Sequence, residues 1–287
     1  MPSIEINGGQ VAYDVLGDDA GVPVVLTPGG RASGELVRSL GERLAAGGAK
    51  VLLWDRPNGG RSDVQFSRRW PSEAHMHADT LQQLIRELGW GPTLLAGGSS
   101  GGRVSIITAI EYPEVTRKLF LWHIAGGVYS SMSLACGYIL GNISTARQGG
   151  MQAVIEMPEW KQRIDQNPRN HERLLAIPQD EFVEVLRLWL DAYVPTPGQA
   201  IPGVSDELFA KIVAPTEIVR SDKTDLEHPL ETCLQVNSLI EGSRIVDSPW
   251  AENAWEEAFA RSRKTGGPPF DLTADVAPPI IEFLRDG

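Results

Sequence analysis

The chain has 287 residues, of which 42% are hydrophobic and 22% are charged, as expected for a soluble globular protein with one large core and an inserted subdomain. Its formal net charge of −11 argues against nucleic-acid binding, which requires a basic surface, and offers no attraction to an anionic membrane. The first residues lack the pattern of a secretory signal, no apolar run is long enough to span a membrane, and Cys136 and Cys233 are far apart, so we expect a cytoplasmic protein without a disulfide framework.

Short apolar strands alternate with helices in the first half of the chain. Asn7, Gly8 and Gly9 form a turn signal between two alternating runs, which predicts an antiparallel hairpin. Each of the following strands is apolar throughout and precedes a helix, so the pattern indicates an α/β protein with a mostly parallel sheet covered on both faces. The predicted strands cover residues 22–27, 50–55, 92–98 and 118–124, and the predicted helices cover residues 35–49, 72–89 and 103–113.

Residues 128–212 break this alternation, because they contain several helix-like stretches without a convincing strand between them. The strand pattern resumes at residues 215–220 and 244–249, and a helix over residues 278–286 closes the chain. We therefore predict a core domain formed by residues 1–127 and 213–287, with residues 128–212 inserted as a helical lid.

The strongest functional signal is the serine pair that follows the strand at residues 92–98. A serine nucleophile on a sharp strand-to-helix turn needs small residues two positions before and two positions after it. Ser99 has Gly97 and Gly101 at these positions, and Ser100 also satisfies the spacing. We favour Ser99, because two glycines then follow the residue after it. The alternatives are a glycine-rich phosphate loop and a simple packing turn.

On this turn and its context, the whole chain resembles the α/β-hydrolase fold superfamily, in the branch with a serine nucleophile. Pro28, Gly29 and Gly30 are similar to the loop after the family's first parallel strand, which usually begins with His-Gly. The resemblance implies that the backbone N–H of Gly30, or of Arg31, stabilises an oxyanion together with the N–H of Ser100. The run from residue 55 to 63 resembles a structural loop of the family, without a catalytic role.

In the family, the loop after the strand at residues 215–220 delivers the carboxylate that orients the catalytic histidine. Asp225 fits this role best, because it precedes the pair His228-Pro229 by three residues, and Asp222 is the alternative. Either side chain could instead be only an acid favoured by a helix N-terminus.

The family's general base is a histidine after the last strand, but residues 249–255 contain none, and no histidine follows His228. This departure matters, because a serine hydroxyl without a base is a poor nucleophile near neutral pH. His75 and His77 lie two residues apart on a helix and point to different faces, so they predict no metal site. His171 is predicted to be an exposed residue of the lid.

Two histidines remain as candidate bases. His123 ends the strand at residues 118–124, and the carboxyl ends of parallel strands face the ligand crevice. The alternative for His123 is a buried, hydrogen-bonded core histidine. His228 shares a loop with Asp225, and its alternative role is capping or packing beside Pro229. We favour His228, because an acid and a base on one loop require the fewest assumptions.

Two further residues are candidates for contacts with substrate. Trp250 occupies the loop where the family histidine is expected, and with Trp255 it could line an aromatic pocket, although such tryptophans are more often core residues. Arg31 lies beside the predicted oxyanion loop, where it could pair with a substrate carboxylate or simply be solvated.

These residues favour a serine-dependent hydrolase that acts on a small, largely apolar carbonyl compound: an ester, a lactone or a C–C bond. The missing C-terminal histidine also allows two alternatives, a cofactor-free lyase or oxygenase and a ligand-binding protein that has lost its base. No residue pattern predicts a cofactor or a metal site, and a small-molecule substrate is the expected partner. Neither the substrate nor the oligomeric state follows from the sequence, because the lid and pocket set the substrate while the fold does not.

Overall fold

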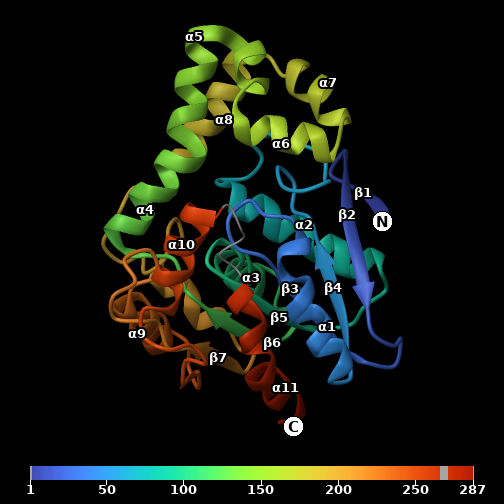
Figure 1. Ribbon diagram of the computed structural model, residues 1–287, viewed down its shortest axis with the longest axis vertical. Helices are drawn as coiled ribbons and strands as arrows, with labels where there is room; N and C mark the ends of the chain where they lie inside the picture. The colour runs from blue at the N-terminus through green and yellow to red at the C-terminus, as the bar shows by residue number, and fades with distance from the viewer. Residues whose placement is uncertain (1, 266–270, 287) are drawn as a thin grey trace.

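The computed structural model describes residues 2–265 and 271–286, and the centre of the molecule is a single twisted sheet (Figure 1). Its strands are β1 (Ser3–Ile6), β2 (Gly9–Leu16), β3 (Val22–Thr27), β4 (Ala49–Trp54), β5 (Thr93–Gly98), β6 (Thr116–Trp122), β7 (Thr216–Val219) and β8 (Arg244–Val246). Their order across the sheet is β1-β2-β4-β3-β5-β6-β7-β8. The pairs β1–β2 and β2–β4 are antiparallel, and the other neighbours are parallel.

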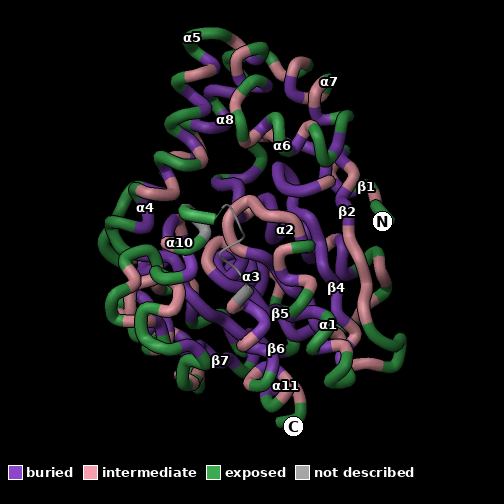
Figure 2. Tube along the Cα trace, viewed as in Figure 1, coloured by how far each residue is buried: buried purple, intermediate pink, exposed green. Residues whose placement is uncertain are grey.

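Helices cover both faces of this sheet. One face packs against α2 (Glu73–Glu87), α3 (Ser100–Glu111) and α9 (Leu230–Leu239), and the other against α1 (Arg38–Ala46) and α11 (Ala277–Arg285). Successive strand residues alternate between the two faces, so Val25 belongs to the first apolar cluster while Val24 and Leu26 belong to the second. Figure 2 shows the strands buried between these helices. The predicted parallel sheet, covered on both faces, is confirmed.

The structure refines several predicted boundaries. The hairpin turn lies where it was predicted, and Asn7 and Gly8 adopt φ of 54° and 78° in it. β6 ends at Trp122, so the prediction that its strand extends to residue 124 is wrong. His123 instead follows the strand with a φ of 45°, a left-handed conformation that cannot continue a strand.

A helical insertion connects β6 to β7 and lies over the carboxyl edge of the sheet (Figure 1). Its apolar side chains, among them Trp160, Phe182 and Trp189, form a cluster that also includes Val64, Trp70 and Met76 of the core. The lid was predicted to extend to residue 212. Residues 200–212 instead contribute apolar side chains to the cluster on the face of the sheet that packs against α2, α3 and α9. The insertion contains α4 (Gly127–Ala135), a π-helical segment (Cys136–Leu140), α5 (Gly141–Ile155), α6 (Pro158–Gln166), α7 (Arg169–Leu175) and α8 (Gln179–Asp191).

The remaining helices are short or lie near the C-terminus. They are α10 (Ala254–Thr265) and the 3-10 helices Gly34–Val37, Pro113–Val115, Asp206–Lys211 and Asp271–Val276. In the part of the chain that the structure describes, no helix has the length and apolar character needed to cross a bilayer.

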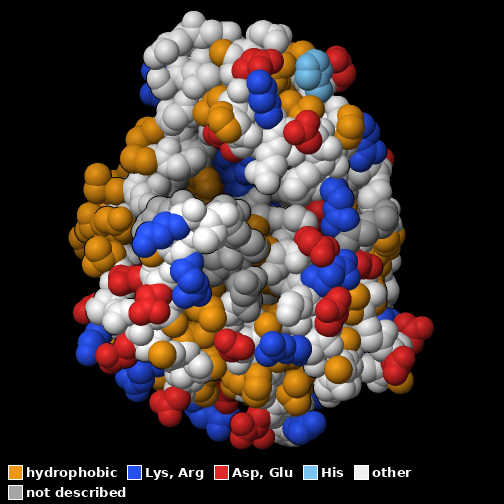
Figure 3. Space-filling view, in the orientation of Figure 1, with side chains coloured by type: hydrophobic (Ala, Val, Ile, Leu, Met, Phe, Trp, Pro, Cys, Tyr) orange, Lys and Arg blue, Asp and Glu red, His pale blue; other side chains and the backbone are white. Residues whose placement is uncertain are grey.

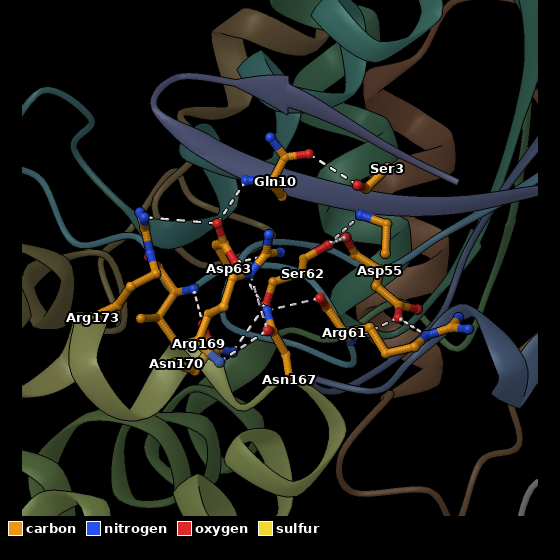
Figure 4. Close-up of polar contacts among 12 residues, drawn as sticks. Ser3, Gln10, Asp55, Arg61, Ser62, Asp63, Asn167, Arg169, Asn170 and Arg173 are labelled. Carbon is orange, nitrogen blue, oxygen red and sulfur yellow. Dashed lines mark hydrogen bonds and ion pairs between the residues drawn. The ribbon is translucent and has the colours of Figure 1, made fainter. Parts of the chain in front are cut away.

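The loop at residues 55–63 forms hydrogen bonds both with the sheet and with the lid (Figure 4). Asp55 accepts hydrogen bonds from the backbone N–H of Gly34 (2.6 Å) and of Arg61 (2.8 Å). Asp63 accepts hydrogen bonds from the N–H of Gln10 in β2 (2.9 Å) and from the side chain of Asn167 in the lid (2.9 Å). These buried contacts agree with the structural role that the sequence resemblance implied for this loop.

Candidate active site

Ser99 lies on the turn between β5 and α3, with φ of 54° and ψ of −125°. This conformation is costly for a residue with a side chain, and it raises the hydroxyl above the end of the sheet. The turn closes only because its neighbours are glycines: a Cβ on Gly101 would lie 2.1 Å from the carbonyl oxygen of Thr27, and one on Gly97 would lie 2.6 Å from the backbone of Gly101. Ser100 is instead the first residue of α3, so the strained turn residue is Ser99.

A cavity of about 230 Å³ opens at Ser99. Its walls come from distant parts of the chain, because the loops after several parallel strands meet at the same edge of the sheet. They include Gly30, Ser99, His123, Tyr138, His228 and Trp255. Both candidate bases, His123 and His228, therefore border the same cavity as the serine.

The loop that contains Gly29 and Gly30 adjoins Ser99, because a Cβ on Gly29 would lie 3.4 Å from the Cβ of Ser99. The guanidinium group of Arg56 donates hydrogen bonds to the carbonyl oxygens of both Gly29 and Gly30. No cis peptide bond occurs in the described residues, and in a trans peptide the N–H points away from the C=O. The N–H groups of Gly30 and Arg31 therefore point away from Arg56.

Ser100 presents a second backbone donor at the same edge. As the first residue of α3 it has no intrahelical acceptor for its N–H, and the positive end of the helix dipole lies there. The two backbone groups that the resemblance implied as an oxyanion hole thus belong to adjoining segments.

Asp225 and His228 form a closely bonded pair in the loop between β7 and α9. The Nδ1 atom of His228 lies 2.8 Å from Oδ2 of Asp225, whose other oxygen accepts the N–H of His228 (3.0 Å). Burial alone would raise the pKa of Asp225, but the hydrogen bonds and charge of His228 outweigh it and lower that pKa to about 2. Since an ionised carboxylate only accepts hydrogen bonds, Nδ1 of His228 carries a proton, which leaves Nε2 as the ring atom that can accept one.

Asp222, the alternative acid, holds the loop together. Its Oδ1 accepts hydrogen bonds from the N–H and hydroxyl of Thr224 (both 2.9 Å), and its Oδ2 accepts one from the N–H of Asn253 (2.6 Å). These contacts connect the loop after β7 to the loop after β8. Of the two candidate acids, Asp225 is the one that is hydrogen-bonded to a histidine.

His123 is enclosed by aromatic rings. Its ring stacks on Trp250 with a centroid distance of 4.6 Å, meets Trp255 edge-on at 4.5 Å, and lies 5.2 Å from the ring of His228. Burial, together with the nearby charge of His228, lowers the pKa of His123 to about 3. Its backbone carbonyl accepts the N–H of Ser99 (2.8 Å). His123 thus supports the serine turn and the ring of His228.

Trp250 and Trp255 lie together, as the sequence suggested, with their rings meeting edge-on at a centroid distance of 5.5 Å. Trp255 lines both the cavity of Ser99 and a neighbouring cavity, whereas Trp250 lines only the neighbouring one of these two. The indole N–H of Trp250 donates to the carbonyl of Leu272 (2.8 Å). The prediction that Trp250 contacts substrate therefore lacks support in the cavity of Ser99.

Arg31 is neither solvated nor unpaired. Its side chain is 4% exposed and forms an ion pair of 3.0 Å with Glu73, whose side chain is 6% exposed. Burial would raise the pKa of Glu73, but Arg31, His77 and a hydrogen bond from Asn58 lower it to about 2, so Glu73 stays ionised.

Sequence reasoning missed Tyr138, which also lines the cavity. A Cβ on Gly30 would lie 3.3 Å from its hydroxyl, and its ring lies 4.9 Å from the guanidinium carbon of Arg31. Burial raises the pKa of Tyr138, so its phenol stays protonated. The residue belongs to the π-helical segment, a feature often found at functional sites, but no local sequence signal marks such a segment.

Among residues 2–265 and 271–286, no group of three or more His, Cys, Asp or Glu side chains could hold a metal ion. The polar groups of the cavity at Ser99 include the imidazole of His228, which is bonded to Asp225, and the side chains of His123, Tyr138 and Glu227. This arrangement, on a strained strand-to-helix turn above a parallel sheet, is typical of α/β-hydrolase folds.

Comparisons with known proteins agree with this class. Residues 22–134 match the family model for the alpha/beta hydrolase fold. The human protein serine hydrolase BPHL is 23% identical over 263 residues, which cover 90% of this chain and 81% of BPHL. An esterase from Thermogutta terrifontis, solved with malate bound, superposes with a TM-score of 0.63 at 20% identity, covering 99% of this chain and 96% of the esterase. The enol-lactonase from Burkholderia xenovorans LB400 superposes with a TM-score of 0.60 at 15% identity, covering 92% and 98%.

The chain has the α/β-hydrolase fold. The fold class predicted from the sequence, an α/β-hydrolase sheet with a helical insertion, is confirmed.

Proposed function

We propose that this protein is a serine hydrolase that cleaves small esters or lactones through an acyl-enzyme formed on Ser99. The observation that carries the proposal is that Ser99 and the Asp225-bound His228 line one small cavity. The similarity of the chain to a human serine hydrolase, an esterase and an enol-lactonase supports a substrate of this kind.

In the proposed reaction, Oγ of Ser99 attacks the substrate carbonyl carbon and Nε2 of His228 accepts its proton. The N–H groups of Gly30 and Ser100, with that of Arg31 as an alternative to Gly30, stabilise the negative oxygen of the tetrahedral intermediate. His228 then donates the proton to the leaving alkoxide as the C–O bond breaks. A water molecule, deprotonated by the same Nε2, hydrolyses the acyl-enzyme, and the proton returns to Oγ of Ser99.

Two observations favour His228 over His123 as the base. Asp225 stabilises the protonated ring of His228 and fixes its tautomer, as a general base requires. His123 faces no carboxylate at hydrogen-bond distance among the described residues, and its pKa of about 3 makes its protonated form costly. A pair of imidazoles beside the serine also favours catalysis over a role restricted to ligand binding.

The test is to compare wild type with Ser99→Ala in two assays: covalent labelling by a fluorophosphonate, read by mass spectrometry, and turnover of small esters and lactones. We expect Ser99→Ala to lose the label and to lower kcat by about 10⁴-fold or more. Ser144→Ala, at an exposed position on α5, serves as the matched control and should behave as wild type.

Equal labelling and turnover in wild type and Ser99→Ala would overturn the proposal. Turnover that survives in Ser99→Ala without any label would instead point to chemistry without an acyl-enzyme, as in a cofactor-free lyase or oxygenase.

A further inference from the structure

A second and larger cavity, of about 690 Å³, lies between the core and the lid. Its core wall includes Arg31 and Leu36, and its lid wall is formed by Gln162, Arg163 and Gln166. Figure 3 shows a hollow between the lid and the core, with a Lys or Arg side chain deep inside it. Leu36 and Thr273 line both this cavity and that of Ser99, so the two cavities adjoin.

Two buried guanidinium groups border this cavity from opposite walls. Arg31 on the core side pairs with Glu73. Arg163 on α6, which is 9% exposed, donates to the neutral backbone carbonyls of Asn58 (2.7 Å) and Glu159 and meets no carboxylate of the described residues. Burial and then the charge of Arg31 lower the pKa of Arg163 to about 10, so Arg163 remains cationic at neutral pH and is repelled by Arg31.

The surroundings add further positive charge. Arg56 and Arg103 are buried beside Arg31, and the Nε atoms of both lack a hydrogen-bond acceptor in the described part of the chain. Glu73 is the carboxylate within this group, and Glu35 at the rim of the larger cavity is already paired with Arg38 (2.7 Å). Asp55, the other buried carboxylate nearby, is paired with Arg61 (2.9 Å). Buried cations are costly unless anions compensate them, and the guanidinium groups of this region outnumber its carboxylates.

We propose that Arg31 and Arg163 bind a carboxylate of the substrate, so that the enzyme acts on esters or lactones that carry a second, anionic group. The planar fork of a guanidinium group matches the two oxygens of a carboxylate, and two such groups face one cavity. Arg31 directly follows Gly30, so the bound carboxylate lies a short chain away from the carbonyl under attack. This inference rests on the proposed function of Ser99.

The first test compares two esters that differ in charge: monoethyl adipate, and the ethyl ester in which the free carboxylate is replaced by an uncharged amide. We expect wild type to favour the charged ester at least tenfold in kcat/KM, and Arg163→Gln to reduce this ratio about tenfold through KM. Arg163→Lys should retain part of the preference. Arg187→Gln makes the same change of charge on an exposed face of α8 and should leave the ratio unchanged.

The second test measures binding without turnover, by titrating adipate into Ser99→Ala in a calorimeter. Adipate should bind to this variant and at least tenfold more weakly after the further change Arg163→Gln, with circular dichroism and Tm verifying that both proteins are folded. Absence of adipate binding and of charge preference would overturn the carboxylate site, while Ser99-dependent labelling would still support a hydrolase. Adipate binding that depends on Arg163, without Ser99-dependent turnover, would refute the hydrolase and retain the anion site.

Discussion

The turn at Ser99 and the loop at residues 221–229 place a hydroxyl and an imidazole at the same cavity, but different interactions hold the two segments in position. Backbone contacts fix the turn, because its glycines leave no space for a Cβ beside Thr27 and Gly101. Side-chain hydrogen bonds fix the loop, in which Asp225 accepts the N–H of Glu227 (2.9 Å) and Asp222 accepts the N–H of Thr224 (2.9 Å).

This difference explains why the proposed nucleophile, Ser99, follows the family pattern while the proposed base, His228, departs from it. A turn fixed by steric contacts cannot move along the chain, but an imidazole needs only an orienting carboxylate and access to the serine. In the proposed mechanism Asp225 and His228 meet both needs from one loop, and Trp250 occupies the loop where the family histidine is expected, stacked on His123.

The largest expected effect comes from removing the hydrogen bond between the carboxylate of Asp225 and the ring of His228. Asp225→Asn should lower kcat by about 10³- to 10⁴-fold, because an amide no longer fixes the proton on Nδ1 of His228 or stabilises the protonated ring. Steady-state kinetics on a small ester measure the effect, and circular dichroism shows whether the fold persists.

Asp222→Asn is the matched control, since it removes a carboxylate from the same loop that contacts no histidine. We expect it to change kcat by less than about tenfold, in line with the loss of exposed hydrogen bonds. If the two substitutions had equal effects, Asp225 would have no special role as the orienting acid.

The steric contacts that fix the turn at Ser99 can be tested by a substitution at Gly101. The Cβ of Gly101→Ala would lie 2.1 Å from a backbone oxygen, which cannot move aside as a flexible side chain can. We expect a loss of about 3 kcal/mol in the free energy of unfolding, measured by urea denaturation.

Gly137→Ala serves as its control, because a Cβ there meets nothing within 4 Å. This second change should be neutral or should stabilise the protein by about 0.5 kcal/mol. Equal stability of the two variants would show that the turn at Ser99 is not closed by steric contacts.

A smaller effect concerns the pH dependence of the stability of the fold, to which the buried His77 contributes. Burial lowers the pKa of His77 from 6.5 to about 3, so between these values the unfolded chain binds a proton that the folded chain does not. The stability contribution of neutral His77 therefore falls as the pH drops below 6.5, by about 1.4 kcal/mol per pH unit. Urea denaturation of His77→Gln between pH 7 and 5 should show a slope reduced by this amount, and an unchanged slope would contradict the buried neutral state.

Much of the fold follows from the sequence because its signals are local. The alternation of apolar strands with helices, the hairpin turn at Asn7 and the glycines around Ser99 each depend on neighbouring residues. The pairing of Asp225 with His228 was also predictable, since His228 lies three positions after Asp225 on one loop.

Other features depend on contacts between distant segments, which local patterns do not encode. Arg31 and Arg163 come to face one cavity only after the lid has packed on the core. Trp255 rather than Trp250 lines the cavity of Ser99 because of how the loop after β8 folds around His123. The end of β6 depends on the left-handed conformation of His123, which β propensity does not reveal.

The central claim is that His228 deprotonates Ser99, and the most direct test is the second-order rate constant for phosphonate labelling of Ser99. The account predicts that His228→Gln lowers this rate constant by about a thousandfold or more, while His123→Gln, verified to be folded, lowers it by less than about tenfold. Labelling of His228→Gln at the wild-type rate would contradict the account.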